Sequence, residues 1–321
     1  MCVIGHLITL VCGCAVLGGF SAPQQPASAD RAAKILAEAR AALGGEEKIA
    51  AVKNFTTTGR TRRVQGENLV PIEFEMAVEL PDKYMRKDEI PAQESEPTTN
   101  GFNGDSLVQS PPLNPPELPP GMPPPPAGQF EAMQKQRVLG TKQDFARLML
   151  GMFATSYSGY PLTFRYIGLA EAPQGKAHVL EATGAGNFTL RYFVHTETHL
   201  PVMVSWQPTA RPGPGRGRGR ESSPSASASA KASASVQGTA EKPAELAAAK
   251  PPEQAAAKPA DKPPDKPTDH RLYFADYRDV DGLKLPFRLR RAIGSDTTEE
   301  TTFDRFRINT RIDPRKFEVR K

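Results

Sequence analysis

The segment HTETH is the one cluster in the sequence with the chemistry of a metal site. It contains His195, Glu197 and His199. In an extended strand these three side chains would share a face, and imidazole together with carboxylate is a ligand set that zinc accepts. The segment, however, lies where the chain must reverse direction before the next strand. A turn would separate the three side chains, so we predict a solvated turn and no metal site.

Acidic residues at alternate positions offer a second possible chemistry. In the stretch IEFEMAVEL, Glu73, Glu75 and Glu79 lie on one face of an extended chain. Three like charges in a row make a poor acid–base pair, and a solvated strand face explains them. The sequence also contains no H-E-x-x-H, no G-x-S-x-G and no glycine-rich phosphate loop. We therefore predict no catalytic residue, no cofactor and no enzymatic activity.

The first residues of the chain have the pattern of an export signal. An apolar stretch, VIGHLITLVCGCAVLGGF, is followed by the small residues Ala27-Ser28-Ala29, so we predict a signal peptide over residues 1–29. All three cysteines lie within it, which leaves the exported chain without a disulfide or a thiolate metal site. Two alternatives stay open, a lipid anchor on Cys14, in the lipobox-like LVCGC, and a retained N-terminal anchor.

Two segments of low complexity interrupt the rest of the chain. Residues 110–127 are rich in proline, which favours a stiff surface loop over a ligand for an SH3-like domain. Residues 208–268 have almost no large apolar residue, so we predict a disordered insertion, a solvated tether more readily than a polyanion site. The stretch between Gln207 and His270 holds three of the five net positive charges. The remainder is near neutral, which argues against a nucleic-acid partner. We predict a single domain over residues 30–321.

The remaining residues of the IEFEMAVEL stretch are apolar and face the other way. Ile72, Phe74, Met76, Val78 and Leu80 form one side of a half-buried strand. Periodicity and turn signals predict helices over 30–43, 46–53 and 129–153 and strands over 55–64, 72–80, 83–90, 101–109, 162–171, 177–182, 187–195, 201–207, 270–278, 283–293 and 297–309. The first helix, with Asp30 as N-cap, has the apolar stripe Ala32, Ile35, Leu36, Ala39 and Leu43, and the third has the stripe Phe145, Leu148, Met149 and Met152.

Several stretches together resemble a known family. They are ALGGEEKIAAVKNFTTTGR after the first helix, the strand entries LPVMV and DGLKLPFRL, in which Pro201 and Pro286 are expected to start strands, and DPRKFEV at the end. The chain resembles the LolA/LolB-like outer-membrane lipoprotein-sorting proteins, as a divergent member. The resemblance implies a mainly β (α+β) fold, an open, curved antiparallel half-barrel with helices covering its concave face, in a periplasmic protein.

The resemblance also implies what the concave face does. It would hold the acyl chains of a lipoprotein or another lipid, and the candidate cavity-lining residues are Ile72, Phe74, Met76, Val78, Leu80, Phe145, Met149 and Met152. Methionine is flexible and polarizable, which suits an interior that accommodates a mobile chain. The alternative is that these residues fill a permanent core in a non-catalytic cell-envelope scaffold, whose proline-rich loop and tether contact envelope proteins. In either case we expect a monomer.

Overall fold

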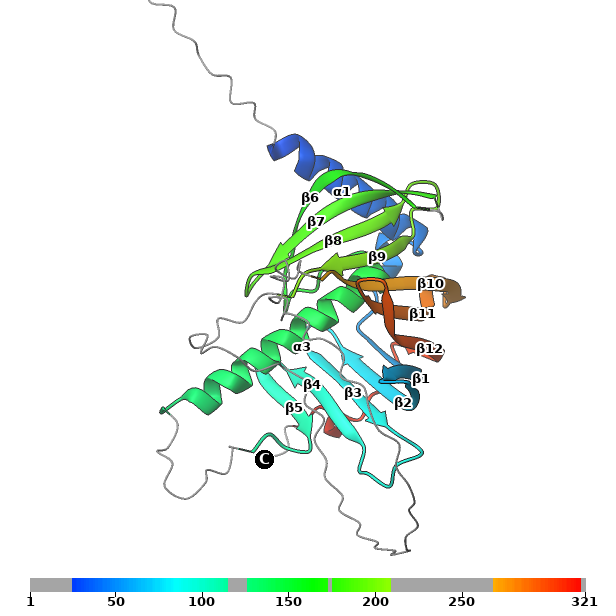
Figure 1. Ribbon diagram of the computed structural model, residues 1–321. Helices are drawn as coiled ribbons and strands as arrows, with labels where there is room; N and C mark the ends of the chain where they lie inside the picture. The colour runs from blue at the N-terminus through cyan, green and yellow to red at the C-terminus, as the bar shows by residue number, and fades with distance from the viewer. Residues whose placement is uncertain (1–24, 115–125, 173–174, 209–267, 319–321) are drawn as a thin grey trace, which may run out of the picture. The chain divides into compact units, whose positions relative to one another are not determined.

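The computed structural model spans residues 1–321 and describes residues 25–114, 126–172, 175–208 and 268–318 (Figure 1). Most of the predicted signal peptide, with Cys14, lies outside the described residues, as do residues 115–125 of the proline-rich loop and residues 209–267 of the insertion. The expectations about these three segments stay predictions. Among the described residues, no helix is long and apolar enough to span a membrane.

The strands of the described residues form one twelve-stranded antiparallel sheet. They are β1 (Asn54–Gln65), β2 (Asn68–Glu79), β3 (Lys83–Glu89), β4 (Thr98–Asn103), β5 (Ser106–Ser110), β6 (Thr163–Ala172), β7 (Gly175–Gly184), β8 (Phe188–His195), β9 (Pro201–Trp206), β10 (His270–Val280), β11 (Leu283–Ile293) and β12 (Asp296–Ile308). Their order in the sheet is β5-β4-β3-β2-β1-β12-β11-β10-β9-β8-β7-β6.

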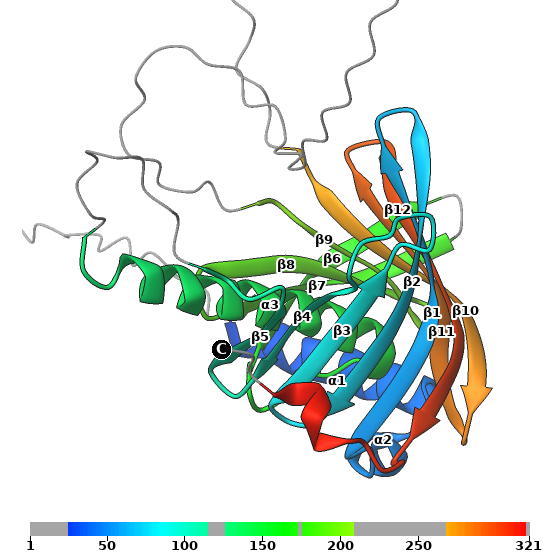
Figure 2. The same ribbon diagram turned by 90° about the horizontal axis from the view of Figure 1, so that it is seen from below.

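This order makes the sheet open. The first and last strands, β1 and β12, pair in its middle, whereas β5 and β6 form its two edges although they follow one another in the sequence. The helix α3 (Gln129–Phe153) lies between them in the chain, and Figure 2 shows the sheet curving around it. The predicted mainly β fold, an open, curved antiparallel half-barrel, is confirmed. The strands β9 and β10 also pair directly, although residues 209–267 separate them in the sequence.

Bulges contribute to the curvature. Both register shifts add a residue to β12, Asp304 opposite Thr58/Gly59 of β1 and Thr298 opposite Arg291/Ala292 of β11, and an extra residue bends the strand that carries it. At Gly59 a Cβ atom would lie 2.3 Å from the carbonyl oxygen of Thr302 on β12. Only glycine allows the two strands to approach this closely at the bulge.

The helices follow the predicted apolar patterns, with two errors at their boundaries. The stripe of α1 (Gln25–Ala42) is buried as predicted, and α1 packs against β6. The N-cap predicted at Asp30 is wrong, because Ala27 and Ala29 are strong helix formers and the helix already runs through them. The cleavage site predicted after Ala29 therefore falls inside α1. The short helix α2 (Glu46–Ala50) ends three residues before its predicted end at Lys53.

Two strand predictions are also wrong in detail. The strand predicted over 101–109 is two strands, because Gly104, with φ of 60°, makes a tight turn between β4 and β5. Pro201 does start β9, but Pro286 lies inside β11, opposite Tyr277. The chain tolerates a proline there because Asp276 on β10 has a positive φ, and the pairing of β10 with β11 is irregular next to it.

The outer face of the sheet is not solvated throughout, which corrects the view of β2 as a strand with one purely solvated side. After β12 the chain forms the 3₁₀ helix η1 (Pro314–Phe317), and its last residue packs on Ala77 and Met85. Phe317 and Ala77 are both fully buried in this contact. Lys316 forms an ion pair with Glu75, and Lys83 pairs with Glu79 at 2.8 Å, so two of the three acids of β2 have cationic partners.

Candidate functional site

The concave face of the sheet is the candidate site, and most of the predicted lining residues meet there. One large buried cluster includes Phe74, Met76 and Val78 of β2 together with Phe145, Met149 and Met152 of α3. Leu80 is partly buried against this cluster, and Ile72 is buried outside it. The sequence thus placed these side chains on the correct face, while their role in binding stays a prediction.

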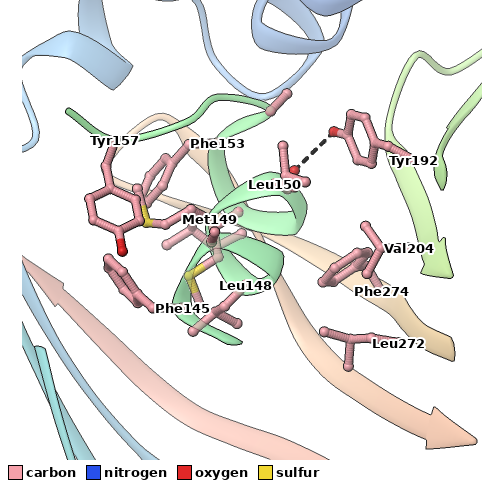
Figure 3. Close-up of a cluster of buried hydrophobic side chains, with 14 of the residues drawn as sticks. Phe145, Leu148, Met149, Leu150, Phe153, Tyr157, Tyr192, Val204, Leu272 and Phe274 are labelled. Atoms are coloured by element: carbon pink, nitrogen blue, oxygen red, sulfur yellow. Dashed lines mark hydrogen bonds between the residues drawn. The ribbon is translucent and has the colours of Figure 1, made fainter. Parts of the chain in front are cut away.

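The C-terminal part of α3 is buried on all sides, not only along the predicted stripe. Every residue from Phe145 to Phe153 is buried, including Arg147 and Gly151. Figure 3 shows Phe145 and Leu148 on this helix, with Leu272, Phe274 and Val204 of the sheet around it. At Gly151 a Cβ atom would lie 2.0 Å from the ring of Phe274, so the helix touches the sheet with no room for a side chain. A helix that is apolar all round is a core element.

Two tyrosines of the sheet hold the end of α3. The last carbonyl groups of a helix have no partner within the helix. The Tyr192 hydroxyl donates to the carbonyl oxygen of Leu150 at 2.9 Å (Figure 3), and the Tyr277 hydroxyl donates to that of Gly151 at 2.9 Å. Tyr277 also donates to the carbonyl oxygen of Pro201 at 3.0 Å. Burial raises the pKa of both tyrosines, so they remain neutral donors at physiological pH.

Aromatic rings fill the interior near the open edges of the sheet. The Phe145 ring lies 4.8 Å from that of Tyr84 and 4.9 Å from that of Tyr157, centroid to centroid. The segment after α3 adds Tyr160, which packs on Phe188 at 5.5 Å and donates to the carbonyl oxygen of Ala185 at 2.6 Å. These contacts link strands near the β5 edge to strands near the β6 edge through the helix and the segment that follows it.

A small cavity remains between α3 and the centre of the concave face. Its volume is about 50 Å³. Of the predicted site residues, only Met76 lines it. The lining has an apolar part, Met76, Tyr84, Leu148, Leu272, Leu289 and Phe303, and a polar part, Arg86, Asp144, Arg291 and Thr301. Around it, the described side chains of the interior are buried against one another.

The charged residues around this cavity were not predicted from the sequence. Arg86 lies opposite Met76 in the pairing of β2 with β3, and Arg291 lies opposite Leu272, so both point inward. The signal was present, because each arginine occupies a core-facing position of its strand, two residues after Tyr84 and Leu289 respectively. Arg147 also interrupts an apolar run on α3.

Each of the three inward arginines has at least one acidic neighbour. Arg86 donates to Asp88 at 2.7 Å and to the Thr61 hydroxyl at 3.0 Å. Burial opposes the charge of Arg86, but Asp88 outweighs it, so the Arg86 pKa is raised.

Arg147 donates to Asp144 at 2.8 Å, and its guanidinium lies 4.2 Å from the Trp206 ring. Burial lowers the Arg147 pKa. Arg291 approaches Glu299 at 3.6 Å.

The other sequence candidates lie elsewhere. The HTETH segment forms the turn between β8 and β9, as predicted, and there the backbone N–H groups of Glu197 and Thr198 donate to Nδ1 of His195 at 3.2 Å. Among the described residues, no three His, Cys, Asp or Glu side chains are grouped as metal ligands. A hollow of about 560 Å³ lies on the outer side of the sheet, where charged residues such as Glu75 and Lys87 line it together with Met85 and Val108. Such a lining does not suit an acyl chain.

Comparison with known proteins gives a likeness in fold. No protein-family model and no curated protein matches the sequence. A LolA superfamily protein from Nitrosomonas europaea has a similar solved structure, with 10% identity, a TM-score of 0.46, and coverage of 90% of this chain and 97% of that one.

An outer membrane lipoprotein-sorting protein domain from Vibrio parahaemolyticus is similar with 10% identity, a TM-score of 0.45 and the coverages 90% and 97%. A DUF1329 family protein from Desulfovibrio piger matches with 8% identity, a TM-score of 0.39 and the coverages 91% and 96%. The matches thus include the class of protein that the sequence resembles. At these identities and TM-scores we carry no ligand, partner or functional residue from them to this chain.

Proposed function

We propose that this protein is a non-catalytic, monomeric carrier or binding protein of the periplasm. Its ligands would be the acyl chains of a lipid or a lipoprotein, held between α3 and the concave face of the half-barrel. The signal-like pattern of residues 1–29 supports export.

One observation carries the proposal: a single helix, not a second sheet, covers the centre of the apolar concave face. The segment with α3 connects the two unpaired edges of the sheet, β5 and β6. Movement of α3 would expose apolar surface without breaking a strand pair. Three methionines, Met76, Met149 and Met152, lie in the cluster under α3 and adapt readily to different neighbours.

The size of the cavity defines what binding requires. A pocket for a small molecule typically has about 300–1,000 Å³, whereas the space under α3 is about 50 Å³. An acyl chain can enter only if α3 moves away from the sheet or its side chains repack. The proposal therefore predicts that ligand uptake and displacement of α3 occur together.

The first experiment asks whether the exported protein carries a lipid. Native mass spectrometry of protein purified from its own host would detect a co-purifying lipid, and titration with a fluorescent fatty acid would measure uptake by the delipidated protein. Hydrogen exchange of the α3 amides, with and without the fatty acid, then tests the displacement. If no lipid co-purifies and no fatty acid is taken up, the carrier function is wrong.

A substitution at Met76 distinguishes a cavity from a core. Tryptophan at this position would occupy the 50 Å³ space, so we expect Met76→Trp to reduce fatty-acid uptake while thermal stability changes little. In a fully packed core, the added volume would instead cost about 1–3 kcal/mol of unfolding free energy. Glu73→Gln is the matched control, because Glu73 is exposed on the outer face of the same strand. A variant that melts several degrees lower with unchanged uptake would contradict the cavity interpretation.

The packed state of the interior favours a second candidate function. A cell-envelope scaffold needs a solid core, and the burial of α3 on all sides fits one. Its partners would be envelope proteins bound by the proline-rich loop or the insertion. Absence of lipid and of uptake, together with binding of an envelope protein that is lost when residues 208–268 are deleted, would favour this function over the carrier.

A further inference from the structure

The cavity under α3 is lined by both charged and apolar residues, and an acyl chain would interact favourably with the apolar ones alone. Its lining includes Arg86 and Arg291 together with the apolar side chains of Met76, Leu148 and Leu289. Burying a charged group beside apolar side chains is costly unless that group is paired. Two guanidinium groups at a water-sized space inside a core therefore call for a physical explanation.

The charged residues around the cavity are paired unevenly. Asp88 pairs with Arg86 at 2.7 Å and Asp144 pairs with Arg147 at 2.8 Å. Glu299 is shared, because Arg291 approaches it at 3.6 Å and Arg63 at 3.5 Å. The three arginines near the cavity thus have three acids, but Arg63, which is 51% exposed, shares Glu299 with Arg291.

The charges of two of these arginines also act on a neighbouring histidine. The inward-facing His270 has a pKa lowered first by burial and then by the charges of Arg147 and Arg291. This shift supports a local positive potential at the site.

The two cavity arginines differ in how firmly they are held. Arg86 is fixed by Asp88, by the Thr61 hydroxyl at 3.0 Å and by the Phe74 ring, which lies 4.4 Å from its guanidinium. Within the described part of the chain, the Arg291 side chain makes no hydrogen bond, and it is 38% exposed. A guanidinium has five N–H donors in a planar fork that matches a carboxylate or phosphate group. Arg291 therefore has donors available for an anionic ligand, next to an arginine that is already in place.

We propose that Arg86 and Arg291 bind the anionic headgroup of a singly charged amphiphile, whose acyl chain continues along Met76 and Leu148 under α3. The inference rests on the proposed function and narrows it from lipids in general to amphiphiles with one negative charge. A fatty-acid carboxylate and the phosphodiester of a lysophospholipid share this chemistry. The headgroup gives Arg291 an anionic partner that it does not have to share with Arg63, and the chain replaces contacts that α3 makes with the sheet.

The experiment compares probes that have the same chain and different headgroups. Isothermal titration calorimetry, with all probes below their micelle concentration, would measure dodecanoate against dodecanol, and lysophosphatidylglycerol against lysophosphatidylcholine. We expect each anionic probe to bind at least tenfold more tightly than its uncharged or zwitterionic partner. This is the size of effect that one hydrogen bond to a charged group has, about 1.4 kcal/mol or more. Inorganic phosphate alone should bind weakly, because it lacks the chain.

Substitutions test whether Arg291 causes the preference for the anionic probes. Arg291→Gln should remove the preference for the anionic probes while leaving the binding of dodecanol unchanged. Arg290→Gln is the control, because Arg290 points to the outer face, where its guanidinium lies 4.2 Å from the Tyr273 ring. Arg86→Gln should act like Arg291→Gln, but it also leaves Asp88 without its cation, so circular dichroism must first show that the variant is folded.

Each result has one meaning. Equal binding of charged and neutral probes, or a preference that survives Arg291→Gln, would overturn the headgroup site and leave the carrier function standing. Phosphate that binds as tightly as the lysolipid would overturn the assignment to an amphiphile. Binding of no probe at all would overturn the proposed function and the headgroup site together.

Discussion

The inner and outer faces of the sheet are made by alternate residues of the same strands, yet different interactions stabilise them. On the inner face of β12, Phe303 packs edge-on against Phe74, with ring centroids 5.6 Å apart, and Thr301 shares a buried hydrogen bond of 2.9 Å with Thr61. On the outer face of the same strand, Thr302 is exposed. The inner face therefore depends on shape and on completed hydrogen bonds, and the outer face depends on solvation.

The largest difference should appear between adjacent residues of β12. Phe303→Ala removes a ring that is 2% exposed, so we expect a loss of about 3–5 kcal/mol of unfolding free energy. Thr302→Val, one residue away on the outer face, should change it by no more than about 0.5 kcal/mol. Urea denaturation of both variants measures the two values. A small loss for Phe303→Ala would mean that the inner face is loosely packed in solution, which would itself favour a ligand cavity.

Substitutions of one inner and one outer tyrosine compare the hydrogen bonds of the two faces. Tyr192→Phe removes one of two donors to the carbonyl oxygen of Leu150, the other being the N–H of Ala154 at 3.1 Å, so we expect a loss of about 0.5–1.5 kcal/mol of unfolding free energy. Tyr273→Phe makes the same chemical change on the outer face, beneath Arg290, and should be close to neutral. Thermal melting of the two variants is the measurement. Equal losses would contradict the idea that Tyr192 holds the end of α3.

A weaker effect should appear on acidification. Burial lowers the pKa of His270 below its usual 6.5, with the Arg147 and Arg291 charges adding to this. The unfolded chain then binds more protons than the folded chain as the pH falls through about 6.5, so stability decreases towards acid pH. His178 contributes with the same sign, because its pKa is also lowered by burial. His270→Gln should reduce the slope of unfolding free energy against pH between about 7 and 5. An unchanged slope in His270→Gln would show that His270 does not sense the positive potential.

The smallest effect on the melting temperature should follow the removal of residues 208–268, which supply no described residue to either face of the sheet. Trp206 and His270 are opposite each other in the pairing of β9 with β10. Replacing residues 208–268 by a two-residue Asn-Gly turn should therefore join the strands and leave the melting temperature nearly unchanged. A drop of many degrees would show that the segment packs on the folded part, and the single interrupted domain would be the wrong description.

The same contrast between faces explains what could be predicted from the sequence. Alternation along β2 and the apolar periodicity of α3 are local patterns, so they located the strand's inner face and the helix from Gln129 to Phe153 correctly. The small residues Ala27 and Ala29 hid the start of α1, because they fit a cleavage site and a helix equally well.

The arrangement inside the half-barrel could not be predicted. It depends on contacts between residues that are distant in sequence, such as Gly151 against Phe274 and Tyr192 against Leu150. Arg86 and Arg291 were overlooked because an apolar strand pattern does not indicate which strand a charged residue will oppose. The size of the space beside Met76 depends on ten side chains from six elements, and no local pattern encodes it.

The pairing of β1 with β12 has a consequence for the order of folding. The Thr57 hydroxyl donates to the carbonyl oxygen of Arg305 at 2.8 Å, and 248 residues separate the two. Hairpins such as β1–β2 and β10–β11 can form as soon as their own residues are available, but the middle of the sheet can close only when nearly the whole chain has been delivered. Such long-range contacts slow folding. Until then β1 has an unpaired edge, which can pair with other chains, so a chain that stops before Asp296 should aggregate instead of forming a smaller stable sheet.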